Sequence, residues 1–188
     1  MKLSHIIMAH GSGGLLSQRL IEEYFVRAFA EHQVPWELND GTVLDLPPGK
    51  AVMSTDSFVI SPLFFPGGDI GKLAVSGTVN DLVACGAQPL YLSTAFILEE
   101  GFSLDSLREI VKSMAHTAQQ AGVKLVTGDT KVVERGSADQ VFINTTGIGV
   151  IPPGIDYRPG RIKPGDRILV SGTIGDHGLT ILAQREGL

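Results

Sequence analysis

Hydrophobic residues recur at helical spacing in several segments of the chain. Between Leu15 and Glu31 they fall three and four positions apart, with polar residues mostly on the opposite side. The same spacing follows Ser103, a good helix N-cap, and ends at Gly122. Lys72–Cys85 consists largely of small and apolar residues before Gly86 and predicts a further helix. The pattern therefore predicts helices over these three segments.

Other apolar runs are short and are bounded by glycine or proline, which is typical of strands. Leu3–Ala9 fits either a short strand or an ordered arm, and Pro62–Gly71, with two prolines and three glycines, predicts a loop. The order of the predicted strands and helices along the chain mixes hairpin and crossover connections. We therefore expect an α+β domain whose mixed sheet carries helices on one face. The predicted strands are Thr42–Leu46, Ala51–Ser61, Pro89–Leu98, Val123–Thr127 and Gln140–Ile151.

The last part of the sequence changes in character. Pro159–Gly165 resembles a linker, Asp166–Ser171 predicts a new apolar strand, and a helix is expected to begin at Leu179. One strand and a partial helix cannot bury a core alone. We therefore expect residues 161–188 to be the beginning of a truncated α/β domain, preceded by a glycine-loop arm and helix (1–41) and a ligand-binding domain (42–155).

Composition narrows the classes of function. The 188 residues are 43% hydrophobic and 19% charged with a net charge of −5, and lysine and arginine form no long run. A surface for nucleic acid or for an anionic membrane is therefore not expected. The single cysteine, Cys85, excludes a disulfide within one chain and is predicted to be buried. The N-terminus does not read as a secretion signal, and a cytoplasmic protein is expected.

A glycine-rich loop, His10-Gly11-Ser12-Gly13-Gly14, follows the first apolar run. Such a loop fits a phosphate cradle, an oxyanion hole or a simple turn, and a lone histidine beside it is more often structural. Two familiar motifs are excluded. Gly67–Leu73 has the wrong glycine spacing for a Walker loop, and neither Ser12 nor Ser171 lies in a G-x-S-x-G sequence.

Acidic residues at or near the ends of predicted elements are more informative. Asp56 lies among serine and threonine, Asp81 follows Asn80 in a small apolar helix, and Asp129 ends a strand two residues before Lys131. Each alone fits a turn, a helix surface or a cap. Together they favour a site in which carboxylates hold Mg²⁺ and the metal bridges the phosphates of a nucleotide.

These motifs jointly resemble one family. The stretches "HGSGG", "LFFPGGDIGKLA", "VTGDTKVVERG", "FINTTGIGVIP" and "GDRILVSGTIGDHG" are similar to those of the hydrogenase maturation proteins called HypE. That family belongs to the ATP-binding superfamily of aminoimidazole ribonucleotide synthetase, selenophosphate synthetase and thiamine-monophosphate kinase. The resemblance extends over nearly the whole sequence.

The resemblance implies ATP and Mg²⁺ as ligands and assigns roles to residues of this sequence. Lys131 and His10 would take the catalytic roles, and the glycine loop would close over the phosphates. The implied metal ligands are Asp56, Asp81 and Asp129, and the implied nucleotide-binding residues are Gly11, Ser12, Gly13, Gly14, Lys72, Asn80 and Thr130.

The implied reaction is ATP-dependent dehydration of an S-carboxamide on a C-terminal cysteine, giving a thiocyanate for nickel–iron hydrogenase. The resemblance further implies a homodimer in which the sheets of two protomers pair, with the carbamoyltransferase HypF and the HypC–HypD complex as partners. Because this sequence ends at Leu188 without that cysteine, we expect the 188 residues to lack turnover. The alternatives are another ATP-dependent enzyme of the superfamily, such as a selenophosphate synthetase or a small-molecule kinase, and a non-catalytic dimerisation module.

Overall fold

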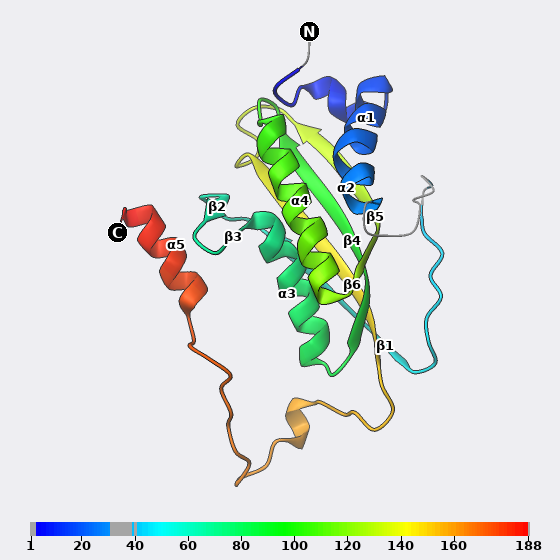
Figure 1. Ribbon diagram of the computed structural model, residues 1–188, viewed down its shortest axis with the longest axis vertical. Coiled ribbons are helices and arrows are strands. Elements are labelled where there is room, and N and C mark those ends of the chain that lie inside the picture. Colours follow the sequence, from blue (N-terminus) through cyan, green and yellow to red (C-terminus); the bar gives the residue numbers. More distant parts are fainter. Residues whose placement is uncertain (1–2, 31–38, 40, 188) are drawn as a thin grey trace.

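The computed structural model describes residues 3–30, 39 and 41–187, and the described part forms a mixed sheet covered by helices on one face (Figure 1). The strand order is β1-β6-β4-β5, with β4 and β5 parallel and the other neighbours antiparallel. This confirms the predicted fold class. The strands of this sheet are β1 (Lys50–Phe58), β4 (Gln88–Glu99), β5 (Lys124–Val133) and β6 (Val141–Ile151).

Two long helices cover the sheet, and the first turn of each is capped by the side chain of the preceding residue. Ser103 accepts a hydrogen bond from the Ser106 amide at the start of α4 (Leu104–Ala121), and Gly122 ends it in the left-handed conformation with φ of 68°. Helix α3 (Ile70–Ala84) begins two residues earlier than predicted because the Asp69 carboxylate accepts from the Gly71 and Lys72 amides.

The N-terminal segment runs as an arm, not a strand. Ile6 is buried and exchanges backbone hydrogen bonds with Gly101 and Phe102. The arm ends in the short helix η1 (Met8–Gly11). The following helical stretch is α1 (Leu15–Leu20), a π-helical segment η2 (Ile21–Val26) and α2 (Arg27–Ala30). The predicted end of this helix, Glu31, lies outside the described residues.

Two predicted strands are wrong. Thr42–Leu46 and Asp166–Ser171 have no strand structure, and Val43 and Ile168 are 97% and 94% exposed. A strand needs a hydrogen-bonded neighbour, and in the described part of the chain neither segment has one. The predicted loop Pro62–Gly71 also needs correction. It contains the two-residue strands β2 (Phe64–Phe65) and β3 (Gly68–Asp69), and its end belongs to α3.

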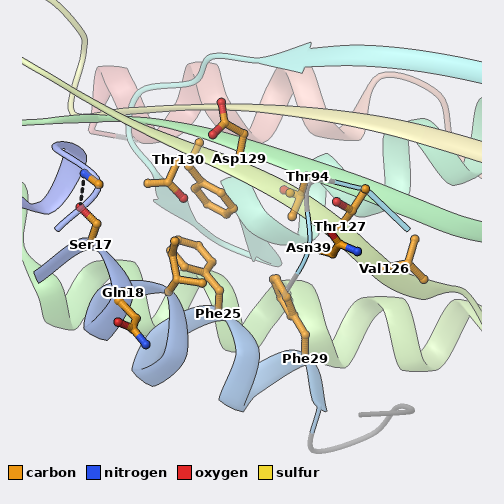
Figure 2. Close-up of a pocket in the computed structure, with 15 residues that line it drawn as sticks. Ser17, Gln18, Phe25, Phe29, Asn39, Thr94, Val126, Thr127, Asp129 and Thr130 are labelled. Atoms are coloured by element: carbon orange, nitrogen blue, oxygen red, sulfur yellow. Dashed lines mark hydrogen bonds between the residues drawn. The ribbon is translucent and has the colours of Figure 1, made fainter. Parts of the chain in front are cut away.

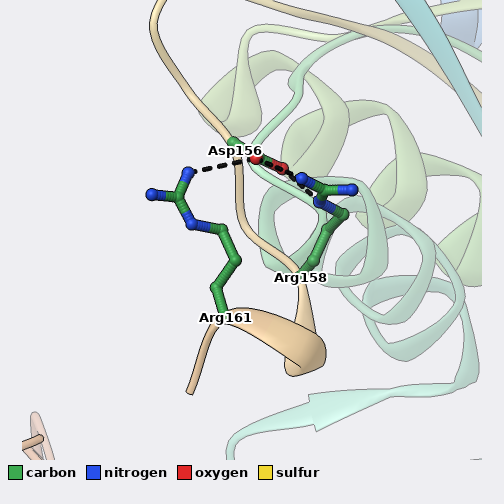
Figure 3. A network of polar contacts seen from close by, with 3 residues as sticks. All are labelled: Asp156, Arg158 and Arg161. Carbon is green, nitrogen blue, oxygen red and sulfur yellow. Dashed lines mark hydrogen bonds and ion pairs between the residues drawn. The ribbon is translucent and has the colours of Figure 1, made fainter. Parts of the chain in front are cut away.

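The segment after β6 leads away from the sheet through η3 (Pro159–Arg161) to α5 (Asp176–Glu186). Arg158 and Arg161 both donate to Asp156, at 2.6 and 3.0 Å, and the hydrogen bond from Arg158 is the main reason that the pKa of Asp156 is lowered (Figure 3). Helix α5 returns to the β2–β3 hairpin, where Arg185 donates to the Ser61 carbonyl at 2.7 Å.

No helix in the described ranges is long and apolar enough to cross a membrane.

Candidate functional site

The glycine loop packs directly against strand β5. A Cβ added to Gly11 would lie 2.8 Å from Cβ of Val132 and 3.0 Å from its backbone nitrogen, so only glycine fits at this contact. The loop is held internally as well. The Ser12 hydroxyl donates to the Ala9 carbonyl at 3.0 Å, and the Gly13 amide donates to the Ser17 hydroxyl at 2.9 Å. The loop is therefore an ordered structure beside the strand that carries Asp129 and Lys131.

His10, the first residue of this loop, is buried and only 6% exposed. Its Nδ1 accepts a hydrogen bond from the Ile7 amide at 3.0 Å. Burial lowers the pKa of His10, which favours the neutral ring, and because an acceptor nitrogen carries no proton, the proton of that neutral ring lies on Nε2. This arrangement stabilises the turn. The catalytic role that the sequence predicts for His10 remains a prediction.

The Gly128-Asp129-Thr130-Lys131 segment lies within β5, which extends to Val133, six residues beyond the predicted end. Side chains alternate along it, so Asp129 and Lys131 share one face, where their charged groups are 3.5 Å apart and mostly exposed. Thr130 points to the other face, toward the helices, as its pairing with the buried Phe96 requires. The edge strand thus offers a charged pair on one face and a hydroxyl on the other.

A cavity of about 530 Å³ lies between β5 and the helical stretch 15–30 (Figure 2). Its size is within the range of small-molecule sites. Phenylalanine rings form its apolar wall, with Phe25 and Phe96 centroids 4.8 Å apart. Figure 2 shows the Asp129 carboxylate directed away from the rings of Phe25 and Phe29. The lining residues are Gly13, Ser17, Gln18, Ile21, Phe25, Phe29, Asn39, Gly41, Thr94, Phe96, Val126, Thr127, Gly128, Asp129 and Thr130.

The other two predicted acids, Asp56 on β1 and Asp81 on α3, lie where this strand packs against the helix, and they are called the Asp56–Asp81 pair below. The Ser54 hydroxyl donates to Oδ2 of Asp81 at 2.7 Å. Oδ2 of Asp56 lies 3.6 Å from the position that a Cβ on Gly77 would occupy, one helical turn before Asp81. Asp56 is half-buried, whereas Asp81, like Asp129, is exposed.

The three acids do not meet within one chain. Asp56 lies on edge strand β1 and Asp129 on edge strand β5, and three strand spacings separate the edges by about 14 Å. The residues that the structure describes contain no group of three or more histidine, cysteine or acidic side chains placed to hold a metal. Mg²⁺ bound with a nucleotide typically takes one or two carboxylates together with phosphate oxygens and water, so the Asp56–Asp81 pair fits such a metal.

Two predicted nucleotide ligands lie at opposite ends of α3. Lys72 donates to the Gly67 carbonyl at 2.8 Å and so links the start of α3 to the turn of the β2–β3 hairpin. Asn80 is exposed beside Asp81, about 12 Å farther along the helix axis. Of these two, only Asn80 lies near the Asp56–Asp81 pair. Cys85 is exposed, contrary to the prediction, because it caps the C-terminal end of the same helix.

Several cavity residues carry no signal in the sequence. Phe25 and Phe29 read only as the apolar face of a helix, and Thr94 reads as one position in a strand. The packing of the helix over β4 and β5 makes them neighbours, which periodicity alone cannot show. Among the residues predicted to bind nucleotide or metal, Gly13, Asp129 and Thr130 line this cavity.

The fold and site together define an α+β domain with an ordered glycine loop at the edge of a mixed sheet and carboxylates on both edge strands. The family model described as "AIR synthase related protein, N-terminal domain" matches residues 38–151. The chain belongs to this family.

Individual relatives are similar over nearly the whole chain. The carbamoyl dehydratase HypE of Azotobacter vinelandii is 60% identical over 96% of this chain and 53% of its own length. The HypE of Escherichia coli K12 is 52% identical over 99% of this chain and 56% of its own length. The chain therefore spans about half the length of the curated relatives that it matches.

Solved structures agree with this similarity. A crystal structure of the hydrogenase maturation protein HypE in complex with ATP is 55% identical, has a TM-score of 0.92, and matches 97% of this chain and 54% of its own. A HypE–HypF complex is 50% identical with a TM-score of 0.73, and matches 93% of this chain and 55% of its own.

Proposed function

We propose that this chain is the ATP-binding part of a carbamoyl dehydratase that serves hydrogenase maturation. The observation that carries the proposal is the similarity, over 97% of the chain, to a HypE solved with ATP. The ordered glycine loop beside Asp129, Thr130 and Lys131 supports it, because a polyphosphate needs backbone amides and a cation close together.

In the proposed reaction, the oxygen of a cysteine S-carboxamide attacks the γ-phosphorus of ATP, ADP leaves, and the amide nitrogen gives up the first of its two protons to a base. The O-phosphorylated intermediate then loses phosphate as its nitrogen gives up its remaining proton, and the product is a thiocyanate. Phosphorylation makes the oxygen a leaving group, so the protein mainly positions the reactants and neutralises charge. We place the substrate cysteine outside these 188 residues, since the relatives are about twice as long.

Most of the predicted site residues have a place in this proposal, but Lys72 has none. Lys131, exposed on the edge strand, neutralises the transferred phosphoryl group, and His10, the first residue of the loop, offers a neutral Nε2–H donor. The loop amides and the Thr130 hydroxyl bind phosphate oxygens. Mg²⁺ would be held by Asp56 and Asp81, with Asn80 beside them, and it would supply charge neutralisation to the phosphates.

We further propose a homodimer in which the two sheets close into a barrel. Each chain has the edges β1 and β5, and a two-fold axis that joins β1 of one copy to β5 of the other makes two identical junctions. The face without helices then points inward. Such a junction would bring the strand that carries Asp129 in one copy beside the strand that carries Asp56 in the other, with Asp129 on the inner face of the barrel and Asp56 toward α3.

The proposed partners are HypF, supported by the similarity to a HypE–HypF complex, and HypC–HypD, which rests on the family resemblance alone. A cytoplasmic site of action is proposed because the reaction consumes ATP. A non-catalytic dimerisation module is the competing proposal, and it predicts no nucleotide binding.

Isothermal titration of the chain with ATP, with and without Mg²⁺, tests the proposal. We expect Mg²⁺-dependent binding that Asp129→Asn weakens at least tenfold while the circular dichroism spectrum stays unchanged. Asp139→Asn, at an exposed position in the turn before β6, is the matched control and should bind like the parent. A chain that binds no ATP in the presence of Mg²⁺ contradicts the proposal.

A further inference from the structure

The end of β5 carries residues of the proposed site and is held by the sheet from one side. Within the described part of the chain, β5 pairs with β4 alone, and at its end the Glu100 amide donates to the Val133 carbonyl at 2.9 Å. Lys131 lies two residues before this end, and Val132 between them contacts Gly11 of the glycine loop. A strand end with one neighbour frays readily, so the contacts after Val133 decide how firmly Lys131 is held.

The carboxylate of Glu99, the last residue of β4, binds two backbone amides of the loop 134–140 that follows β5. Its Oε1 accepts from the Gly136 amide, and its Oε2 accepts from the Gln140 amide at 3.0 Å. The Glu99 amide also donates to the Gln140 carbonyl at 2.9 Å. The hydrogen bonds from Gly136 and then Gln140 lower the pKa of Glu99, so the carboxylate is ionised at neutral pH. One side chain thus ties both halves of the loop to the end of β4.

The loop adopts a backbone conformation that needs such support. Gln140 has a φ of 67° and is the non-glycine residue with a positive φ among the described residues, and Gly136 has a φ of 85°. A left-handed conformation is costly for a residue with a side chain and persists only where its surroundings hold it. Glu99 contacts Gln140 at both its amide and its carbonyl, so the shape of the loop depends on Glu99.

We propose that Glu99 is a positioning residue for Lys131: its carboxylate holds the loop after β5 and thereby keeps the end of the strand, with Lys131, in place for the phosphates. The inference rests on the proposed ATP-binding function. Glu99 pairs with Val133 and Lys131 pairs with Ile97, so Glu99 lies about 7 Å farther along the sheet than Lys131. Without the carboxylate, Lys131 is in place in only a fraction of the molecules, and the apparent affinity for ATP falls by that fraction.

Glu99→Gln tests the role of the carboxylate with little change of shape. The glutamine amide group donates and cannot accept, so one of the two loop amides loses its acceptor. We expect the affinity for ATP in the presence of Mg²⁺, measured by titration calorimetry, to fall about fivefold. Glu109→Gln, at an exposed position on α4, is the matched control and should bind like the parent. An unchanged affinity in Glu99→Gln overturns the inference.

A double-mutant cycle separates positioning of Lys131 from a general loss of structure. Lys131→Met should weaken ATP binding about tenfold or more, because the cation beside the phosphates is removed. If Glu99 acts through Lys131, adding Glu99→Gln to Lys131→Met should change the affinity by less than about 1.5-fold. The same fivefold loss in both backgrounds overturns the inference, and so does a Lys131→Met variant that binds ATP like the parent.

Amide hydrogen exchange of the unliganded chain tests the positioning without ATP. In Glu99→Gln, exchange over residues 131–136 should be about fivefold faster than in the parent, while exchange in α4 stays the same. Unchanged exchange over residues 131–136 overturns the inference. A parent chain that binds no ATP contradicts the proposed function instead, and faster exchange in the variant then still supports the hold of Glu99 on the strand that carries Lys131.

Discussion

The hydroxyl of Ser54 on β1 donates a 2.7 Å hydrogen bond to the carboxylate of Asp81 on α3. The bond joins the sheet to the helix at the point where Asp56 also approaches α3, near Gly77. It orients Asp81, which is otherwise an exposed helical carboxylate with many rotamers. The contact therefore prepares one of the two carboxylates proposed to hold Mg²⁺.

Ser54→Ala is expected to weaken Mg²⁺–ATP binding about fivefold, roughly 1 kcal/mol, because Asp81 must then be ordered when the metal binds. Titration calorimetry measures the change. Ser113→Ala, on α4, is the control and should leave the affinity unchanged. An unchanged affinity in Ser54→Ala would show that Asp81 does not take part.

Mixed dimers test whether the acids act across two copies. Asp56→Asn and Asp129→Asn should each weaken Mg²⁺–ATP binding at least tenfold. If β5 of one copy meets β1 of the other, a heterodimer of the two variants contains one site with both aspartates intact. Mixing and reannealing the variants should then restore about one quarter of the parent binding capacity, half of the dimers having one of two sites. No recovery would contradict the proposal that the two acids act together across the dimer.

Gly11→Ala should push the glycine loop away from β5, because the new Cβ would lie 2.8 Å from Val132. We expect a loss of about 1–3 kcal/mol in the free energy of unfolding, typical of overpacking, together with weaker ATP binding. Urea denaturation and calorimetry measure the two effects. Gly14→Ala is the matched control, since no atom lies within 4 Å of its added Cβ. Equal effects in the two variants would refute a role for the Val132 contact.

Acidification should destabilise the chain through His10. Burial lowers its pKa below the ordinary value of about 6.5, so as the pH falls through that value the unfolded chain takes up a proton before the folded chain does. Stability is therefore constant above this range and falls below it. His10→Asn, whose side-chain oxygen can accept from Ile7, should flatten the dependence of the urea midpoint between pH 7.5 and 5.5. His116→Asn, at an exposed position, should leave it as in the parent.

Asp69→Ala should remove the N-cap of α3, where Oδ1 accepts from the Gly71 amide at 2.7 Å and from the Lys72 amide at 3.3 Å. The expected loss is about 1–2 kcal/mol of unfolding free energy, measured by urea denaturation. Asp105→Ala, an exposed acid in the first turn of α4, should cost about 0.5 kcal/mol or less. Similar losses in both variants would argue against the cap.

The elements predicted best are those whose information is local. Helix α4 begins at its Ser103 cap and ends at Gly122 because periodicity, capping and a glycine with φ of 68° all lie within one stretch of sequence. The predicted strand ends at Thr127, six residues before the end of β5 at Val133. Its polar continuation is a strand only because it pairs with β4 as far as Val133 opposite Glu99.

The residues of the candidate site also fall into those that the sequence predicts and those that only the structure shows. Asp129 was predicted from its residue type and its place in the sequence, and Gly13 and Thr130 from the family resemblance. These three residues line the cavity, whereas Thr94 and Phe96 come from another strand and Phe25 from a helix. Among the described residues the buried Thr94 hydroxyl has no hydrogen-bond partner, which depends on its surroundings and has no signature in the sequence.

By itself, the sequence determined the mixed α+β fold, the helix boundaries set by caps, and the residue types suited to a nucleotide and a metal, because these depend on spacing and chemistry along the chain. Only the tertiary structure decided that Thr42–Leu46 forms no strand, that Asp56 and Asp129 lie on opposite edges, and that Gly11 seats against Val132. Pairing and packing join residues far apart in sequence, and neither partner alone encodes the contact.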